Sequence, residues 1–397
     1  MIEFADAAMS LVGALAWQRP AELMLPCRVE MLDATGLRSI DAEQWDGLAS
    51  DALEDNPWLS RQMVLAGLDA FGAEVGLRAL ALYRHGSDQL IGLLPFRVRG
   101  AGAMGVGKVA LNIYQVAGTP LVAREHAQLA MMGLFGVMAQ APGLPRHWVF
   151  PHVAAESAFI EMARTKARRL GLELGMAATY RRPVLTRAAG DFAGHVAGVI
   201  GRKRAKDIER NLRRLAKEGE VRFERVNEPA PVAQRVEDFL AIEAAGWKGK
   251  RGTALLSCPA DADFARRAFG GRGAGQGLAS VDSLLLDGMP IAVSVNIAAG
   301  ATLFTPKCAF DERYRKFGPG MALEYMVIEA FFAGDRYERM DAATTVDGHV
   351  IGGLWGETRT MGTLVVGPAG MTTRTLVAGI DAVARGKRAI KRVLGRG

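Results

Sequence analysis

The sequence predicts an α+β protein made of two similar halves, each with a mixed, mainly antiparallel sheet flanked by helices. The first reason is a weak internal repeat, in which strand, helix, antiparallel strands, helix and strand follow one another twice. This order differs from the regular βαβ alternation of a doubly wound fold. The second reason is length, because 397 residues exceed one ordinary core. The third is composition: 50% of residues are hydrophobic and 23% are charged, so the whole length can bury a core.

Each copy of the repeat opens with a strand and a helix, continues with alternating strands, and ends with an apolar helix and a short strand. In the first copy we expect these elements at Cys27–Asp33, Ala42–Leu53, Leu77–Tyr83, Leu90–Val98, Arg124–Ala139 and Trp148–Phe150. In the second copy we expect them at Glu220–Val226, Val232–Ala245, Val281–Leu286, Pro290–Ala298, Ala301–Lys307, Gly320–Ala333 and Arg339–Ala342. We expect one sheet per copy. The domains then run over 27–185 and 186–375, between an N-terminal segment at 1–26 and a basic tail at 376–397.

Positive charge is concentrated in two segments. Residues 202–217 hold eight basic and two acidic side chains, and residues 385–396 hold six basic and no acidic ones, although the whole chain carries only +7. Apolar residues at 3-4-3 spacing predict that the first segment is a helix with a narrow apolar seam. Such a helix suits a polyanionic partner, namely RNA, an anionic surface or the phosphates of a cofactor, or it is simply a solvated face.

Neither a metal site nor a membrane span is predicted. Cys27, Cys258 and Cys308 are odd in number and far apart, and His147 and His152 lack a carboxylate partner at metal-ligand spacing. The apolar stretches are too short to cross a bilayer. The N-terminal one follows acidic rather than basic residues, which is the wrong polarity for a signal peptide. We therefore expect reduced thiols and a cytoplasmic protein.

Three glycine patterns compete as phosphate-binding loops. Gly100-x-Gly102-x-x-Gly105 has the dinucleotide fingerprint, and Gly102 to Lys108 nearly spells a P-loop, but the residues that follow read as strand or loop rather than as the required helix. The third pattern, Arg315-Lys316-Phe317-Gly318-Pro319-Gly320, runs straight into an apolar helix. Glycines there let the backbone approach phosphates, while the helix dipole and the two cations favour negative charge. An ordinary Gly/Pro helix entry remains the alternative.

This third pattern fits [Gln/Arg]-x-x-Gly-x-[Gly/Ala], the signature by which GNAT (acyl-CoA N-acyltransferase) enzymes hold the pyrophosphate of acyl-CoA. Further runs carry the resemblance: Gly246-Trp247-Lys248-Gly249, Leu286-Asp287-Gly288-x-Pro290-Ile291-Ala292, and Lys307-x-Ala309-Phe310-Asp311-Glu312-x-Tyr314. The sequence resembles GNAT-like acetyltransferases often labelled CelD or cellulose-biosynthesis proteins. The resemblance covers most of the chain, residues 200–345 above all. It implies tandem GNAT-like domains, as in Fem-type peptidyltransferases.

The resemblance implies transfer of an acetyl or other acyl group from acyl-CoA to an amine, or to a hydroxyl, of a small-molecule, saccharide or peptide acceptor in envelope or polysaccharide biosynthesis. It requires a base, for which we expect Asp341 first and Glu324 second, and a proton donor, for which Tyr314, Tyr325 and His349 are candidates. We expect acyl-CoA to contact Phe304, Thr305, Lys307, Arg315, Lys316, Gly318, Gly320 and Met321. We expect the acceptor to contact Lys307, Asp311, Trp247 and Trp355.

The first copy carries Gln115-x-x-Gly118-x-Pro120 in place of the second copy's loop. Proline at the last position removes flexibility and one N–H, so we expect the first domain to shape the acceptor side and not to hold CoA. Two other functions stay open. One is a Fem-type transferase that uses aminoacyl-tRNA, with helix 202–217 as the RNA contact. The other is a non-catalytic scaffold, because a Tyr-Lys pair typical of the resembling proteins is missing before Trp355.

Overall fold

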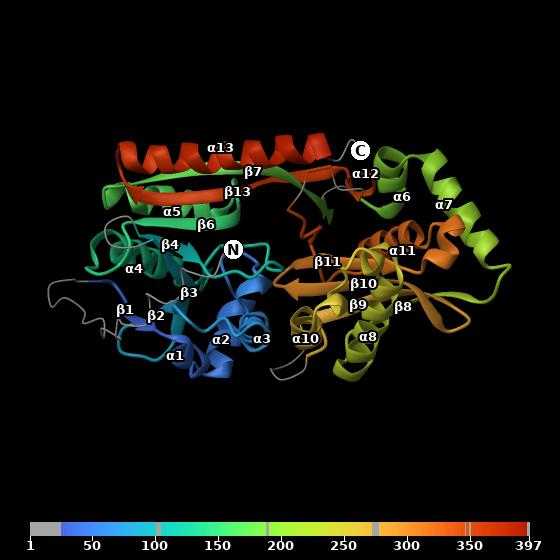
Figure 1. Cartoon of the computed structure of the whole chain (residues 1–397), viewed down its shortest axis with the longest axis horizontal. Helices are drawn as coiled ribbons and strands as arrows, with labels where there is room; N and C mark the ends of the chain where they lie inside the picture. The colour runs from blue at the N-terminus through green and yellow to red at the C-terminus, as the bar shows by residue number, and fades with distance from the viewer. Residues whose placement is uncertain are drawn as a thin grey trace, which may run out of the picture.

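The computed structural model describes residues 25–100, 105–187, 190–271, 278–345, 347–348 and 351–394, and its strands join in one 13-stranded mixed sheet. The sheet runs the length of the molecule, and helices cover it (Figure 1). Strand order is β1-β2-β3-β4-β6-β13-β7-β12-β11-β10-β9-β8, with β5 paired to β3. The α+β prediction is confirmed. The two expected sheets are joined edge to edge into one.

The first lobe contains β1 (Arg28–Leu32), α1 (Ala34–Arg38), α2 (Ala42–Ser50), η1 (Pro57–Leu59), α3 (Arg61–Phe71), β2 (Leu77–Tyr83), β3 (Leu90–Arg99), β4 (Val106–Val109), β5 (Leu121–Val122), α4 (Ala127–Gln140), β6 (His147–Ala154), α5 (Ala158–Arg169) and β7 (Leu172–Thr186). Side-chain caps start several of these helices. Asp41 accepts from the backbone N–H of Gln44, and Ser157 from that of Ile160. β4 is a strand where a dinucleotide-binding fingerprint would need a helix, which agrees with our rejection of that motif.

The second lobe contains α6 (Phe192–His195), η4 (Val196–Ile200), α7 (Arg202–Leu215), β8 (Val221–Val226), α8 (Pro229–Ala245), α9 (Trp247–Lys250), η5 (Leu255–Ser257), α10 (Pro259–Ala268), β9 (Ala279–Leu286), β10 (Met289–Ala299), β11 (Thr302–Phe310), η6 (Glu312–Phe317), α11 (Pro319–Ala333) and β12 (Arg339–Asp341). α12 (Gly352–Trp355), β13 (Glu357–Pro368) and α13 (Met371–Leu394) follow. The order repeats that of the first lobe, with α8, α10 and α11 in the places of α2, α3 and α4.

The last strand of each lobe pairs with a strand of the other lobe. β7 pairs with β12 through Val184–Thr186, so the first part of the chain completes the sheet of the second lobe. β13, near the C-terminus, pairs with β6 and thereby completes the sheet of the first lobe. α13 then packs along β7 and β13 (Figure 1). The predicted boundary at 185/186 coincides with the end of β7, but β13 lies in the first lobe's sheet.

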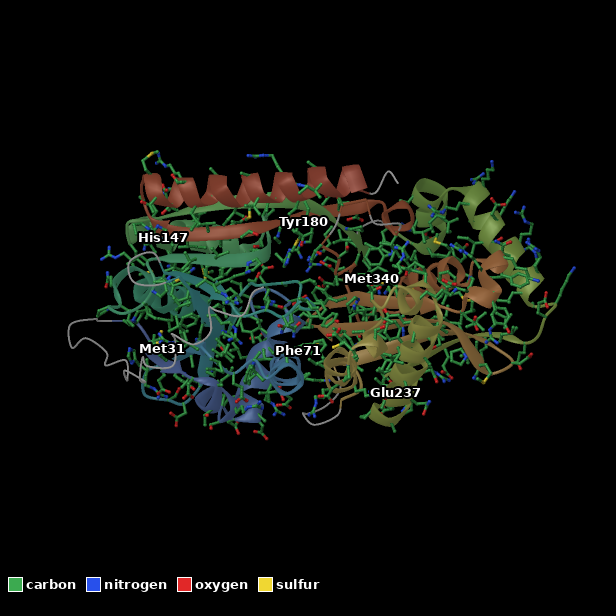
Figure 2. The ribbon with its side chains drawn as sticks, in the orientation of Figure 1. Met31, Phe71, His147, Tyr180, Glu237 and Met340 are labelled. Atoms are coloured by element: carbon green, nitrogen blue, oxygen red, sulfur yellow. The ribbon has the colours of Figure 1, made fainter. Side chains whose placement is uncertain are left out.

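A shared core joins the lobes. One buried cluster contains Trp58 and Met63 of the first lobe together with Phe239 and Phe264 of the second. Phe71 on α3 lies 5.4 Å from Phe264 on α10, ring centroid to centroid, near the middle of the molecule (Figure 2). Burial of aromatic rings on both sides makes this contact a continuous apolar interface.

The described residues were compared with the requirements of a membrane span and of a metal site. Among the described helices, none is long and apolar enough to cross a membrane. The described residues also contain no cluster of three His, Cys, Asp or Glu side chains placed to hold a metal ion.

Candidate functional site

The second lobe's sheet opens between β11 and β12. The two strands pair in parallel over three residues only, and Phe304 opposite Asp341 is the last pair. β11 continues to Phe310 along β10, with an irregular register between Val295 and Ile297. Such a bulge bends its strand away from the neighbour. The edge of β11 beyond Phe304 therefore faces an opening, although Pro306 supplies no N–H there.

The glycine loop lies at the end of this edge. The 3-10 helix η6 ends at Gly318, whose φ of +63° is a left-handed conformation that favours glycine. α11 starts at once with Pro319, and no side chain caps its N-terminus. A Cβ added at Gly320 would lie 3.3 Å from the Phe310 ring. The loop thus combines a glycine backbone with an uncapped 15-residue helix, which is the arrangement that binds anions.

Cations surround the loop. Arg315 and Lys316 are exposed on η6. The Lys316 Nζ lies 4.7 Å from the centroid of the Phe317 ring, and the Arg214 guanidinium of α7 lies 5.5 Å from the same ring. The C-terminal end of the basic helix therefore adjoins the loop, which suits a phosphorylated ligand.

Glu324 occupies the second turn of α11 and is buried. Its Oε1 accepts a hydrogen bond from the indole Nε1 of Trp355 over 2.7 Å. Burial raises the pKa of Glu324 to about 7, and the Trp355 hydrogen bond opposes this rise. A carboxyl group with such a pKa can accept a proton near neutral pH.

Asp341, at the end of β12, is fully buried between two guanidinium groups. Its carboxylate oxygens lie 3.6 Å from Arg182 Nη1 and 3.9 Å from Arg359 Nη1, and Oδ1 accepts from the backbone N–H of Ala343. The Asp341 carboxylate is thus engaged by two guanidinium groups and a backbone N–H. Asp341 Oδ2 and Thr305 Oγ1 are both buried without a hydrogen-bond partner at the point where the strands separate.

Lys307 connects the opening to the first lobe. Its Nζ lies 4.7 Å from the ring centroid of Tyr114, which belongs to the loop after β4. Burial first, and then Lys248, lower the pKa of Lys307. The Tyr114 hydroxyl hydrogen-bonds to Asp261 of α10. One wall of the site is therefore built by the first lobe.

A cavity of about 240 Å³ lies beside the free edge of β11, between that strand and α8–α9. Trp247, 51% exposed, lines it together with Cys308 and the buried Glu243. Lys248 Nζ pairs with Glu243 Oε1 over 2.6 Å. The Cys308 side chain is exposed and lines this cavity.

The remaining predicted residues have other surroundings. The sequence predicts Trp355 in the acceptor pocket, but its indole is fully buried against Glu324. Tyr325 points to α7, where its hydroxyl donates to Glu209. Asp311 caps η6 and binds Arg313, which lowers the pKa of Asp311. Phe304 is buried edge-on to Trp58 of the first lobe, 6.4 Å between centroids.

The last three predicted site residues are Tyr314, Met321 and His349. Tyr314 lies half-buried on η6 and Met321 half-buried on α11, so both border the loop. His349 lies outside the described residues.

Sequence comparison shows that the second lobe is similar to a known family of domains. Residues 202–353 match the Acetyltransferase (GNAT) domain family. These residues include the opening, the glycine loop and α11, and the first lobe repeats the same order of elements. The chain has a tandem GNAT-like architecture.

Solved structures agree with this fold. The chain is similar to "Crystal structure of FemX", with a TM-score of 0.53, 11% identity, and 85% of this chain and 96% of that chain covered. It is also similar to L-PGS from Bacillus licheniformis, with a TM-score of 0.50, 12% identity and coverages of 87% and 96%. A conserved protein of unknown function from Bacteroides thetaiotaomicron gives a TM-score of 0.51 at 9% identity, with coverages of 86% and 99%. Identities this low establish the fold alone. No curated protein sequence matches the chain.

The loop of the first GNAT-like lobe that corresponds to the glycine loop packs against other parts of the chain. The Gly118 N–H donates to the Pro151 carbonyl over 2.9 Å, and a Cβ at Gly118 would lie 2.5 Å from that oxygen. Gln115 donates to the Trp58 carbonyl, and Asn56 Nδ2 donates to the carbonyls of Ala117 and Thr119. Pro151 therefore occupies the space beside Gly118 that a pyrophosphate would need.

Sequence reasoning missed the residues that reach the GNAT site from distant segments. Arg182 lies on β7 and Arg359 on β13, and both converge on Asp341 only because these strands cross between lobes. Tyr114 was not singled out, although it lies one residue before the Gln115 motif of the first copy. That proximity was the only sequence signal for Tyr114, and Arg182 and Arg359 had none.

Proposed function

We propose that the protein transfers an acyl group from acyl-CoA to an amine, or less readily to a hydroxyl, of an acceptor that lies between the two lobes. The observation that carries this proposal is the contrast between the two glycine loops. In the second lobe the loop is left-handed at Gly318, uncapped and surrounded by cations. In the first lobe Pro151 packs against the loop, with its carbonyl oxygen 2.5 Å from the position of a Cβ at Gly118, whereas nothing lies within 4 Å of that position at Gly318.

The residues present fit acyl-CoA as the donor substrate. Arg315 and Lys316 supply positive charge for the pyrophosphate, and the N-terminus of α11 supplies its dipole and the N–H of Gly320. Pro319 has no N–H, and the N–H groups of Met321 and Ala322 donate to the Gly318 carbonyl. The free edge of β11 beyond Phe304 offers backbone groups to the pantetheine arm and to the thioester carbonyl oxygen. Of the two corresponding loops, only that of the second lobe has open space beside its first glycine, so we expect one acyl-CoA per chain.

In this reaction the amine nitrogen of the acceptor attacks the thioester carbonyl carbon, the new C–N bond forms and the C–S bond breaks. We assign Glu324 as the base that takes the proton from the amine, because its pKa of about 7 matches neutral pH. CoA leaves as a thiolate and takes up a proton, for which Tyr314 and His349 remain the candidates. Asp341 then holds Arg182 and Arg359 in place and is not the base.

The acceptor is expected in the cavity beside β11. Trp247 presents an exposed indole there, and the Glu243–Lys248 pair supplies polar groups. An aromatic platform with polar neighbours suits a saccharide or a peptide side chain that carries an amine. This reading agrees with a role in envelope or polysaccharide biosynthesis.

A second candidate rests on α7. Arg202, Lys203, Lys206, Arg213 and Lys217 are exposed in and just after this helix, and none has an ion-pair partner among the described residues. α7 ends beside the glycine loop. An aminoacyl-tRNA donor could therefore bind α7 through its phosphate backbone while its aminoacyl end lies at the reaction centre.

One assay separates the two donors. Release of free CoA is followed chromatographically with acetyl-CoA and a panel of amino sugars and amines, and transfer from charged tRNA is followed with the same acceptors. CoA release that depends on the acceptor and is lost in Glu324→Gln supports the proposal. Transfer from charged tRNA, with no CoA release for any acceptor, would favour the second candidate.

A further inference from the structure

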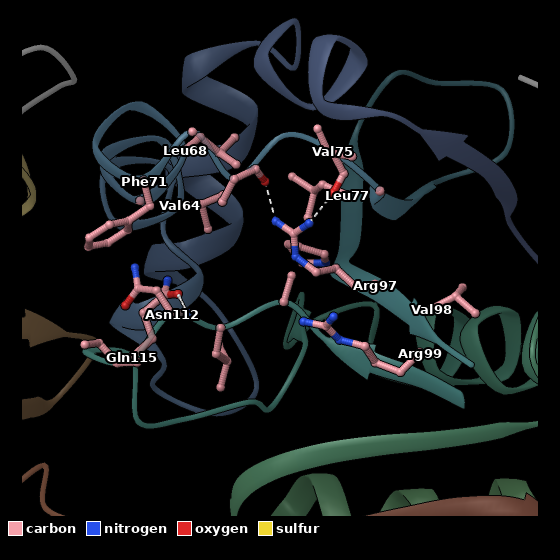
Figure 3. A pocket seen from close by; sticks show the side chains of 18 of the residues that line it. Val64, Leu68, Phe71, Val75, Leu77, Arg97, Val98, Arg99, Asn112 and Gln115 are labelled. Carbon is pink, nitrogen blue, oxygen red and sulfur yellow. Dashed lines mark hydrogen bonds between the residues drawn. The ribbon is translucent and has the colours of Figure 1, made fainter. Parts of the chain in front are cut away.

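We propose that the first lobe contains a second ligand site, which takes an apolar molecule that ends in a carboxylate or phosphate group. The site is a cavity of about 560 Å³ between α3, β2, the end of β3 and the loop after β4 (Figure 3). This volume lies within the range of about 300 to 1,000 Å³ that small-molecule pockets occupy. The proposal does not depend on the acyl-transfer reaction.

The walls of the cavity are apolar. Val64 and Leu68 of α3 line one side, and Leu77, Pro95 and Leu111 line the opposite side. Two further apolar side chains lie at the cavity and are strongly exposed: Val75 is 88% exposed and Ile113 is 81% exposed. Large aliphatic side chains exposed at a cavity gain free energy when an apolar ligand covers them.

Two guanidinium groups make the cavity positive. Arg97 and Arg99 alternate along β3 and therefore lie on the same face, where both line the cavity (Figure 3). Arg97 is fixed by donating to the carbonyls of Ala73 and Val75 in the turn between α3 and β2. Within the described ranges no ion pair joins either guanidinium to a carboxylate, and the one charged group that acts on Arg97 is Arg99. Burial and the neighbouring Arg99 lower the pKa of Arg97, as expected for a cation without a counter-charge.

One amide donor is also unused. Asn112 Nδ2 is buried and has no hydrogen-bond partner, whereas Asn112 Oδ1 accepts from the backbone N–H of Tyr114. Asp261, the acidic residue that lines the cavity, hydrogen-bonds to the Tyr114 hydroxyl. A buried donor without a partner costs free energy, so this wall of the cavity is not optimised for the fold alone.

The loop that holds Asn112 also reaches the other lobe. Leu111, Asn112 and Ile113 face this cavity, and the next residue, Tyr114, lies under Lys307. The cavity is thus a neighbour of the GNAT site and separate from it, because Arg97 and Arg99 belong to the first lobe's sheet.

Calorimetric titration of the full chain tests the proposal with four probes, each kept below its micelle concentration. Dodecanoate and dodecyl phosphate carry both features of the ligand, dodecanol carries only the apolar part, and inorganic phosphate carries only the charge. We expect saturable binding of the two amphiphilic anions alone. The better of the two identifies the head group. Equal binding of dodecanol, or of inorganic phosphate, would overturn the proposed ligand class, and no binding at all would overturn the site.

Variants of exposed residues keep the fold intact. Arg99→Gln and Ile113→Asp are expected to weaken binding of the amphiphilic anions about tenfold or more, since each removes attraction for the anion or adds repulsion. Arg169→Gln, at the end of α5 and outside the cavity, is the matched control and should leave the affinity unchanged. Unaltered affinity in both cavity variants would contradict the placement of the site.

Discussion

The indole Nε1 of Trp355 donates to Oε1 of Glu324 across 2.7 Å, and both side chains are buried. This contact joins α12 to the helix that starts at the glycine loop. Because the hydrogen bond favours the charged form of a carboxyl group that burial makes less acidic, Trp355 sets the pH at which Glu324 can accept a proton.

Replacing Trp355 should therefore move the pH profile. In Trp355→Phe the opposing hydrogen bond is lost, so the pKa of Glu324 rises above its value of about 7. We expect the acid limb of kcat/KM to shift to higher pH. The matched control is Trp148→Phe, because the Trp148 indole is buried without a hydrogen-bond partner. An identical acid limb in the wild type and Trp355→Phe would argue against Glu324 as the base.

Glu324 should also make the free energy of unfolding depend on pH. Its pKa is raised in the folded state from 4.5 to about 7, so the folded chain binds more protons than the unfolded chain between these values. The free energy of unfolding should therefore fall by up to about 3 kcal/mol as pH rises from about 4.5 to 7. Urea unfolding at several pH values measures this slope. Glu324→Gln should flatten it, and an equally steep slope in that variant would rule out the assignment.

The left-handed glycine of the loop should matter for binding. Gly318→Ala places a Cβ on a residue with φ of +63°, which costs about 1 kcal/mol and displaces the start of α11. We expect acetyl-CoA affinity to fall at least about tenfold. Gly288→Ala, at φ of +76° in the β9–β10 turn, imposes similar strain away from the site and should leave affinity unchanged. Equal affinity in the two variants would mean that the loop does not contact the nucleotide.

The first lobe's loop should matter for stability instead. Gly118→Ala forces a Cβ to within 2.5 Å of the Pro151 carbonyl oxygen, so we expect a loss of about 1–3 kcal/mol of unfolding free energy. Acetyl-CoA affinity, measured by calorimetry well below the melting temperature, should not change. A large affinity loss at preserved stability would place CoA in the first lobe.

Much of the fold followed from local patterns. Hydrophobic alternation and the Asp287–Gly288 turn predicted the β9–β10 hairpin, and the 3-4-3 seam predicted helix α7 within a few residues. The Gly318–Pro319–Gly320 loop was predicted to lead into an apolar helix, and it does. These features depend on residues close together in the chain.

The crossed strands depend on residues far apart and were not predicted. β13 inserts between β6 and β7, although about 170 residues of the chain separate it from the end of β7. Alternation in a single strand says nothing about which strand it pairs with. For the same reason the sequence did not reveal that Arg182 and Arg359 flank Asp341, because this contact forms only when β7, β12 and β13 lie side by side.

The most direct test of the account is a calorimetric titration of the full chain with acetyl-CoA, repeated with an Arg315→Ala/Gly320→Val variant. The account predicts one molecule bound per chain and no binding to the variant, because Arg315 loses its charge and the valine side chain meets the Phe310 ring. Two molecules per chain, or unchanged binding to the variant, would contradict a single acyl-CoA site at the second lobe's glycine loop.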